Sequence, residues 1–257
     1  MEWYLYVAVI AAGLIAGFIN TLAGSGSLIT LPLLMFLGLP ANVANGTNRV
    51  GILLQNIVGV GSFRQQKVLD VRGGIFLAIP AVIGAVLGAQ IAVKLDEQLM
   101  RKTIGALMVM FLFLLLVRPK RWLEGRPGME KHRPSIFQLF IFFCIGVYGG
   151  FIQAGVGIFL LAGLVLGAGY DLVRANAVKV LINFCFTPLA LGVFVLEGQV
   201  AWVVGLILAA GSSLGAWIAA RTAVKQGAAF VRWLLIGVVV VSAVSLLGVV
   251  DLIRSLL

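Results

Sequence analysis

The sequence predicts an all-α polytopic membrane protein made of two inverted repeats of about five hydrophobic segments each, with short broken or re-entrant helices. Three observations predict this fold class: the composition, an internal repeat and the placement of the basic residues. Of the 257 residues, 61% are hydrophobic and 11% are charged, whereas an ordinary soluble domain is about 45 to 50% apolar and about 25% charged. We therefore expect the chain to fold in a lipid bilayer.

The apolar residues gather in runs, several of which approach the roughly 20 residues that a helix needs to cross a bilayer. The first run, Trp3 to Leu22, follows Glu2 rather than a basic cluster, so we interpret it as a span and not as a secretory signal. The later runs are Ile75 to Val93, Ile104 to Val117, Ile136 to Tyr148, Val200 to Ala220 and Phe230 to Val250.

An internal repeat divides the chain in two. A shift of 131 positions (154 − 23 = 131) aligns Asn45 with Asn176 and Arg101 with Arg232, and such polar matches are harder to obtain by chance than matches of small residues. The same shift lays Ala23, Gly24 and Gly26 on Ala154, Gly155 and Gly157. We predict a first membrane repeat at 1–117, a basic linker at 118–134 and a second membrane repeat at 135–257.

Each repeat is expected to hold five segments. An odd number makes the second repeat enter the membrane from the opposite side, which is the inverted-repeat topology of many transporters. In the first repeat the predicted segments are 4–22, 27–38, 46–63, 73–93 and 103–117. An open alternative has four full spans per repeat, with the first two segments forming a re-entrant pair.

The basic residues set the predicted orientation. The stretch 118–134, RPKRWLEGRPGMEKHRP, holds six Lys or Arg against two Glu, and cytoplasmic loops carry an excess of Lys and Arg. We therefore expect a multi-pass protein of the plasma (inner) membrane, with this loop cytoplasmic and both termini outside. Most of the 19 Lys and Arg residues then lie inside. The exceptions are Arg49, Lys94, Arg101, Lys102 and Arg254.

A break is predicted in the second segment, within TLAGSGSLITLPLL at 21–34. The apolar run that follows, Leu28 to Leu37, covers only about half of the roughly 30 Å apolar core at about 1.5 Å per residue. Glycines and serines at 24–27 let the backbone approach a ligand closely, and free N–H groups at the start of a helix attract negative charge. Gly155 and Gly157 repeat the pattern. The alternative is that these glycines only permit close helix packing.

Polar residues follow each short segment. Asn45, Thr47, Asn48 and Arg49 open the third segment, and Asn176, Lys179 and Asn183 share one helical face in the second repeat. Asn56 lies on the same face as Asn45 and Asn48, with Gln55 beside it. Polar side chains inside a membrane mark a functional site unless they cap helices or reach the interface. That alternative has Asn45 and Asn176 as caps and Arg49 and Lys179 extending to the membrane surface.

The acidic residues narrow the substrate class. All nine lie in or beside predicted loops, and the single histidine, His132, belongs to the basic linker. Proton pumps commonly carry Asp, Glu or His within the membrane, and a cationic substrate would lack a counter-charge here. An anionic substrate fits this pattern. The nine are Glu2, Asp70, Asp96, Glu97, Glu124, Glu130, Asp171, Glu197 and Asp251.

The motifs together resemble the TauE/SafE family of sulfite and organosulfur anion exporters. The resemblance is carried by Gly17 to Ser27 (GFINTLAGSGS), Leu31 to Leu34, Gly38-Leu39-Pro40 and Asn45 to Arg49. It extends over nearly the whole chain, including the second glycine motif and the basic linker. The resemblance implies a plasma-membrane carrier for small sulfur-containing anions such as sulfite, sulfonates or related carboxylates.

We expect a transporter and not an enzyme, with a small anion and the bilayer as partners, no nucleic acid, and a homo-oligomer as one arrangement. No phosphate-binding or dinucleotide fingerprint occurs, so no cofactor or metal is expected. A membrane serine hydrolase built on Ser25 would lack a nearby base, whereas a channel or an assembly protein stays an alternative. Cys144 and Cys185 lie in apolar runs and are expected to be buried free thiols. The predicted substrate-binding residues are Asn20, Gly24, Ser25, Gly26, Ser27, Asn45, Thr47, Asn48, Arg49, Gln153, Gly155, Gly157, Asn176, Lys179 and Asn183.

Overall fold

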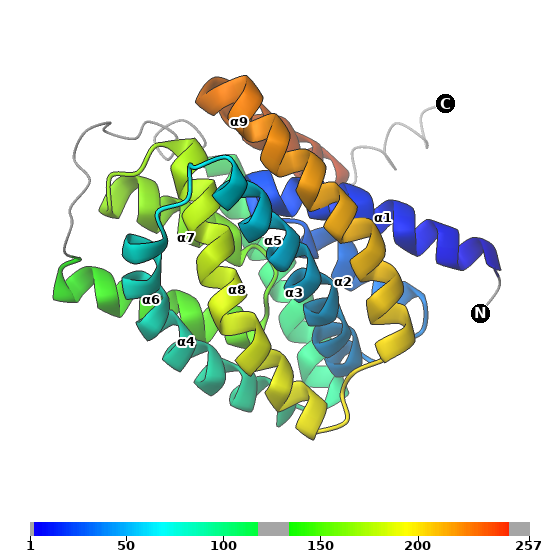
Figure 1. Ribbon diagram of the computed structural model, residues 1–257. Coiled ribbons are helices and arrows are strands. Elements are labelled where there is room, and N and C mark those ends of the chain that lie inside the picture. The colour runs from blue at the N-terminus through cyan, green and yellow to red at the C-terminus, as the bar shows by residue number, and fades with distance from the viewer. Residues whose placement is uncertain (1–2, 118–133, 247–257) are drawn as a thin grey trace.

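The chain, seen here as a computed structural model, is described over residues 3–117 and 134–246, where every element is a helix (Figure 1). In order, the helices are α1 (Trp3–Ala23), α2 (Ser27–Phe36), α3 (Ala41–Gln65), α4 (Val71–Val93), α5 (Glu97–Val117), α6 (Ile136–Phe151), α7 (Val156–Ala162), the π-helix η1 (Gly163–Gly167), α8 (Leu172–Leu196) and α9 (Trp202–Leu246).

The long helices have the length and composition of membrane spans. Among the described residues, four helices are apolar enough over a sufficient length: Leu5–Ala23, Val71–Val93, Leu172–Leu196 and Trp202–Gln226. On α4, large apolar side chains one turn apart are exposed, namely Ile75, Ile79, Ile83, Leu87 and Ile91, while Gly and Ala between them are buried. An apolar stripe of this kind suits contact with lipid, so the predicted all-helical membrane protein is confirmed.

Six helices form a continuous series of contacts. α1 packs on α9, α9 on α3, α3 on α8, α8 on α4, and α4 on α6. The outer pairs use glycine to bring backbones together: Gly13 and Gly17 of α1 lie against Leu208 and Ser212 of α9, and Gly146 and Gly150 of α6 lie against Ala81 and Ala85 of α4. Spacings of four between small residues are typical of close helix packing in membranes. α3 and α8 therefore lie at the centre of the series.

The two predicted breaks are confirmed. α1 ends at Ala23 and α2 begins at Ser27, while α6 ends at Phe151 and α7 begins at Val156. Gly24 and Gly155 adopt left-handed backbone conformations, with φ of 76° and 69°, which glycine adopts at little cost. The helices that follow are short, since α2 has 10 residues and α7 has 7. Neither is long enough to cross a bilayer alone as a straight helix.

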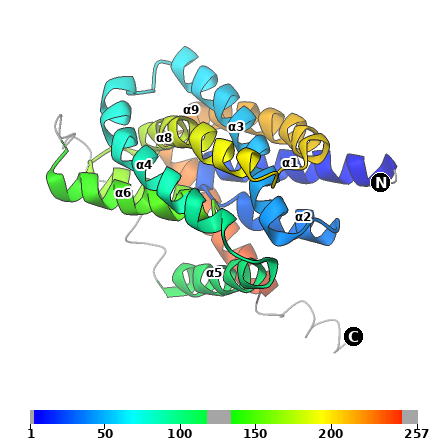
Figure 2. The same cartoon turned by 90° about the horizontal axis from the view of Figure 1, so that it is seen from below.

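One predicted loop is wrong. The apolar runs Val200 to Ala220 and Phe230 to Val250 predict two segments with a loop between them, but α9 is helical throughout its 45 residues. Figures 1 and 2 show that its orange-red C-terminal part changes direction and comes to lie beside α5. The corresponding stretch of the first half does break, because Asp96 accepts a hydrogen bond from the Leu99 N–H and caps α5. At the matching position the chain has Gly227, which has no side chain to form such a cap.

Several predictions fall partly or wholly outside the described residues. The basic linker 118–134 does so except for Pro134, as do Glu2, Glu124, Glu130, His132, Asp251 and Arg254. The described acids lie at helix ends as expected; Asp70 and Asp171, for example, are the N-caps of α4 and α8. Both cysteines are free, but Cys144 is exposed on α6 and Cys185 is only partly buried, so their predicted burial is wrong.

Candidate functional site

The glycine breaks of the two halves touch one another. A methyl group added to Gly24 would clash with the backbone of Gly157, and one added to Gly157 would clash with the backbone of Gly24. The two breaks thus meet backbone to backbone, which requires glycine on both sides. This contact holds the ends of α1, α2 and α7 at one place inside the protein.

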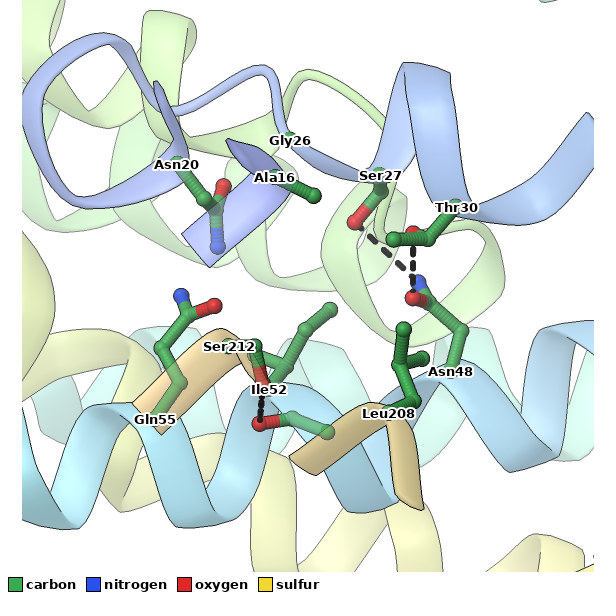
Figure 3. Close-up of a pocket in the computed structure, with 11 residues that line it drawn as sticks. Ala16, Asn20, Gly26, Ser27, Thr30, Asn48, Ile52, Gln55, Leu208 and Ser212 are labelled. Atoms are coloured by element: carbon green, nitrogen blue, oxygen red, sulfur yellow. Dashed lines mark hydrogen bonds between the residues drawn. The ribbon is translucent and has the colours of Figure 1, made fainter. Parts of the chain in front are cut away.

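A small cavity lies beside the first break (Figure 3). It is lined by the end of α1, the start of α2, the middle of α3 and one face of α9. Four predicted site residues line it, which are Asn20, Gly26, Ser27 and Asn48. The remaining lining residues are Ala16, Thr30, Gly51, Ile52, Gln55, Leu208 and Ser212.

One wall of the cavity is a closed hydrogen-bond network. The Thr30 hydroxyl donates to the Asn48 side-chain oxygen at 2.6 Å, and the Asn48 amide nitrogen donates to the Ser27 hydroxyl at 3.1 Å (Figure 3). These bonds tie α2 to α3. Ser212 is also satisfied, because its hydroxyl donates to the carbonyl oxygen of Gly51 at 3.2 Å.

Other groups around the cavity have spare hydrogen-bonding capacity. Asn20 and Gln55 point toward one another in Figure 3, and neither side-chain amide forms a hydrogen bond with another residue of the described chain. The backbone N–H groups of Gly26 and Ser27, at the start of α2, likewise have no acceptor among the described residues. Amide and helix-start N–H groups are donors suited to an oxygen-rich anion.

Arg49 lies outside this cavity and binds the end of α6. Its guanidinium donates to the carbonyl oxygens of Gly150 at 2.6 Å, Gly149 at 3.1 Å and Phe151 at 3.4 Å. It also donates to the side-chain oxygen of Gln153 at 3.4 Å, and it stacks on the Phe194 ring at 4.6 Å. A planar fork of donors suits several carbonyls at a helix C-terminus, where the partial charge is negative.

Lys179 binds the end of α1 in a similar way. Its ammonium group donates to the carbonyl oxygens of Thr21 at 2.7 Å and Asn20 at 3.0 Å, and to the side-chain oxygen of Asn176 at 2.8 Å. The predicted common face of Asn176 and Lys179 is confirmed by this contact. Each half therefore places a cation on the C-terminal end of the first helix of the other half.

Both cations are fully buried and lack a carboxylate partner. Arg49 and Lys179 are each 0% exposed, and neither forms an ion pair with a described residue. The alternative in which they extend to the membrane surface is therefore wrong. The caps of their helices are also not Asn45 and Asn176, because Pro40 and Asp171 occupy those positions. Among the described residues, no acid compensates either charge.

The other predicted residues are spread around these clusters. Asn45 donates to the Phe151 carbonyl oxygen at 2.8 Å, Thr47 accepts from the Ala201 N–H at 2.9 Å, and Gln153 donates to the Thr187 hydroxyl at 2.9 Å. Ser25 is buried in the break. Asn183 has an unpaired side-chain oxygen.

The predicted site residues did not include Thr30, Gln55 and Ser212, which line the cavity. Thr30 and Ser212 are single hydroxyls in apolar helices and give no pattern in the sequence. Gln55 could have been predicted as a site residue, because it is an amide inside a predicted span. No cluster of three or more His, Cys, Asp or Glu side chains that could hold a metal occurs among the described residues.

Comparison with known proteins identifies the family. The profile described as Sulfite exporter TauE/SafE matches residues 9–246, which is most of the chain. The chain belongs to the TauE/SafE family. This confirms the resemblance seen in the sequence motifs, and it makes the chain a member of a transporter family and not of an enzyme family.

Relatives described as probable membrane transporter proteins occur in several bacteria. The TauE/SafE chain is 30% identical to "Probable membrane transporter protein ORF9" of Sinorhizobium sp. over 96% of its own length and 94% of the relative's length. It is also 30% identical to the Haemophilus influenzae protein "Probable membrane transporter protein", over 89% of each chain. For "Probable membrane transporter protein YfcA" of Escherichia coli, the identity is 30% over 90% and 84% of the two chains. No solved structure gives a significant match to the chain.

Proposed function

We propose that this TauE/SafE protein carries small anions, with sulfur oxyanions such as sulfite as the first candidates, through a central site by alternating access. The observation that carries the proposal is the pair of buried cations without carboxylates, next to a cavity lined by neutral donors. A buried positive charge that is already bonded to carbonyls can still attract an anion at a distance.

The attraction between a buried cation and an anion in the cavity is large enough to select for negative charge. A unit negative charge about 10 Å from one buried cation gains about 1.7 kcal/mol at an effective dielectric constant of about 20. Two such cations favour an anion over a neutral molecule, while they disfavour a cation by the same amount. The direct contacts to the anion would come from Asn20, Gln55 and the free N–H groups of Gly26 and Ser27.

The contacts between the halves support an inverted-repeat arrangement. The packed helices follow one another in the order α1–α9–α3–α8–α4–α6. If α1 is matched with α6, α9 with α4 and α3 with α8, each helix has the same neighbours as its match. Arg49 and Lys179 fit the same matching of helices, since each binds the C-terminal end of the first helix of the other half. Such a relation gives a carrier two similar states, one facing each side of the membrane.

Transport in proteoliposomes tests the proposal. Purified full-length protein should exchange radiolabelled sulfite across the membrane, and unlabelled sulfite on the far side should accelerate uptake of the labelled anion. Flux without this acceleration would indicate an anion channel, and preference for acetate over sulfite would indicate a carrier of small carboxylates. Transport of choline but not of sulfite would refute anion carriage.

A further inference from the structure

Two buried asparagines are not among the residues that line the cavity described above. Asn56 of α3 is 1% exposed and Asn183 of α8 is 3% exposed. Both polar atoms of the Asn56 amide, and the side-chain oxygen of Asn183, have no hydrogen-bond partner. Leaving a buried polar group unpaired costs about 1 to 3 kcal/mol. A protein that retains such groups in its interior commonly uses them.

The packing of α3 on α8 places the two asparagines at one level. A Cβ added to Gly46, near the start of α3, would lie 3.0 Å from the ring of Phe194, near the end of α8. A Cβ added to Gly59 would lie 2.9 Å from Val180, nearer the start of α8. The helices are therefore antiparallel. Asn56 lies one turn before Gly59 on α3, and Asn183 lies one turn after Val180 on α8. Because Gly59 contacts Val180 and the helices are antiparallel, the two asparagines lie at the same height along the contact, one turn further on.

This level lies between the two buried cations. On α8, Asn183 follows Lys179 by one turn and precedes Thr187 by one turn. Thr187 accepts from Gln153, and Gln153 in turn accepts from Arg49. The polar groups at both ends of this α3–α8 seam are thus hydrogen-bonded, whereas the amides in its middle are not.

We propose that Asn56 and Asn183 form a second anion site, in which the transported oxyanion is held between Arg49 and Lys179 while it is closed off from both sides of the membrane. The inference rests on the proposed function. A half-turn of the terminal side-chain torsion exchanges the oxygen and nitrogen of an amide, so both residues can present N–H donors. A metal cation does not fit, because the neighbouring charges are positive and no described carboxylate lies at this level.

Near-isosteric apolar substitutions test the site. N56L and N183L remove the unpaired amides without leaving a large cavity, so the melting temperature of the full-length protein should stay equal or rise. Sulfite counterflow in proteoliposomes should fall at least about tenfold, because donors to a charged ligand are lost. A matched control is N42L on the same helix; Asn42 donates to the Leu95 carbonyl oxygen at 3.2 Å, away from the seam. N42L should lower the melting temperature and retain counterflow.

The outcomes separate the two proposals. Absence of counterflow of sulfite and of every other small anion in the unmodified protein would refute the proposed function and the second site with it. Counterflow in the unmodified protein that N56L and N183L leave unchanged would refute the second site alone. A lower melting temperature in both variants would also refute it, because the amides would then serve the fold.

Discussion

At the scale of single residues, Arg49 and Lys179 show how a membrane interior accommodates full charges. Neither is neutralised by an acid among the described residues. Each instead donates to backbone carbonyls at the end of an interrupted helix, where several dipoles point the same way. The carbonyls need a partner because the helix stops inside the protein, and the cations need acceptors because both side chains are fully buried. The same contact thus satisfies both requirements and keeps a positive charge in the interior.

Replacing Arg49 by Gln should therefore damage both folding and transport. The shorter neutral side chain cannot reach Gly149, Gly150 and Phe151 together, and each carbonyl left unpaired costs about 1 to 3 kcal/mol. We expect R49Q to lose about 3 kcal/mol of stability or more, and to lose sulfite counterflow at low and high ionic strength alike, because a buried charge is little screened by salt.

Chemical denaturation and proteoliposome flux at two salt concentrations measure these effects. R101Q is the control, since Arg101 forms an exposed pair with Glu97 and exposed pairs contribute little. Normal flux in R49Q, or a defect that appears only at low salt, would show that Arg49 does not act from the interior.

At the scale of elements, the break between α1 and α2 depends on Gly24 for two separate reasons. Its φ of 76° is left-handed, and its backbone lies directly against Gly157. Gly38 meets only the first condition, with a φ of 89° and no atom within 4 Å of an added Cβ. Substitutions at Gly24 and Gly38 therefore distinguish the free-energy cost of a left-handed backbone from the cost of disturbing the contact with Gly157.

G38A should lose about 1 kcal/mol, the usual penalty for a side chain in the left-handed region. G24A should lose more than G38A and should also reduce counterflow strongly, because the two breaks must move apart. Thermal unfolding and flux of the two variants provide the comparison. Equal losses of stability with normal flux in both would show that the contact between the breaks has no functional part.

The sequence is sufficient to predict the two helix breaks, but it is not sufficient to predict which groups bind the residues beside them. Gly24 and Gly155 lie before short apolar runs, and that local pattern predicts an interruption without knowledge of the fold. The acceptors of Arg49 are backbone carbonyls of α6, far away in the chain, and a carbonyl has no residue-type signal. Thr30 and Ser212 reach the cavity only because α2 and α9 pack against α3. The continuity of α9 has no signal in the sequence, because Lys225 matches Lys94 and such a match indicates a loop that α9 does not have.

At the scale of the whole molecule, the exchange of helix ends between halves favours opposite insertion of the two repeats. Lys94, at the end of α4, and Lys225, at the matching position in α9, are both exposed, so single cysteines there can be labelled. Five segments per repeat place these positions on opposite sides of the membrane, whereas four spans per repeat place them on the same side.

In a background without Cys144 and Cys185, K94C should react with a membrane-impermeant maleimide in intact right-side-out cells. K225C should react only after the membrane is permeabilised, and this second reaction is the control that the thiol is accessible. The reason is geometric, because an odd number of crossings separates the two lysines. Reaction of both cysteines in intact cells, or of neither, would favour the four-span alternative and remove the symmetry on which alternating access rests.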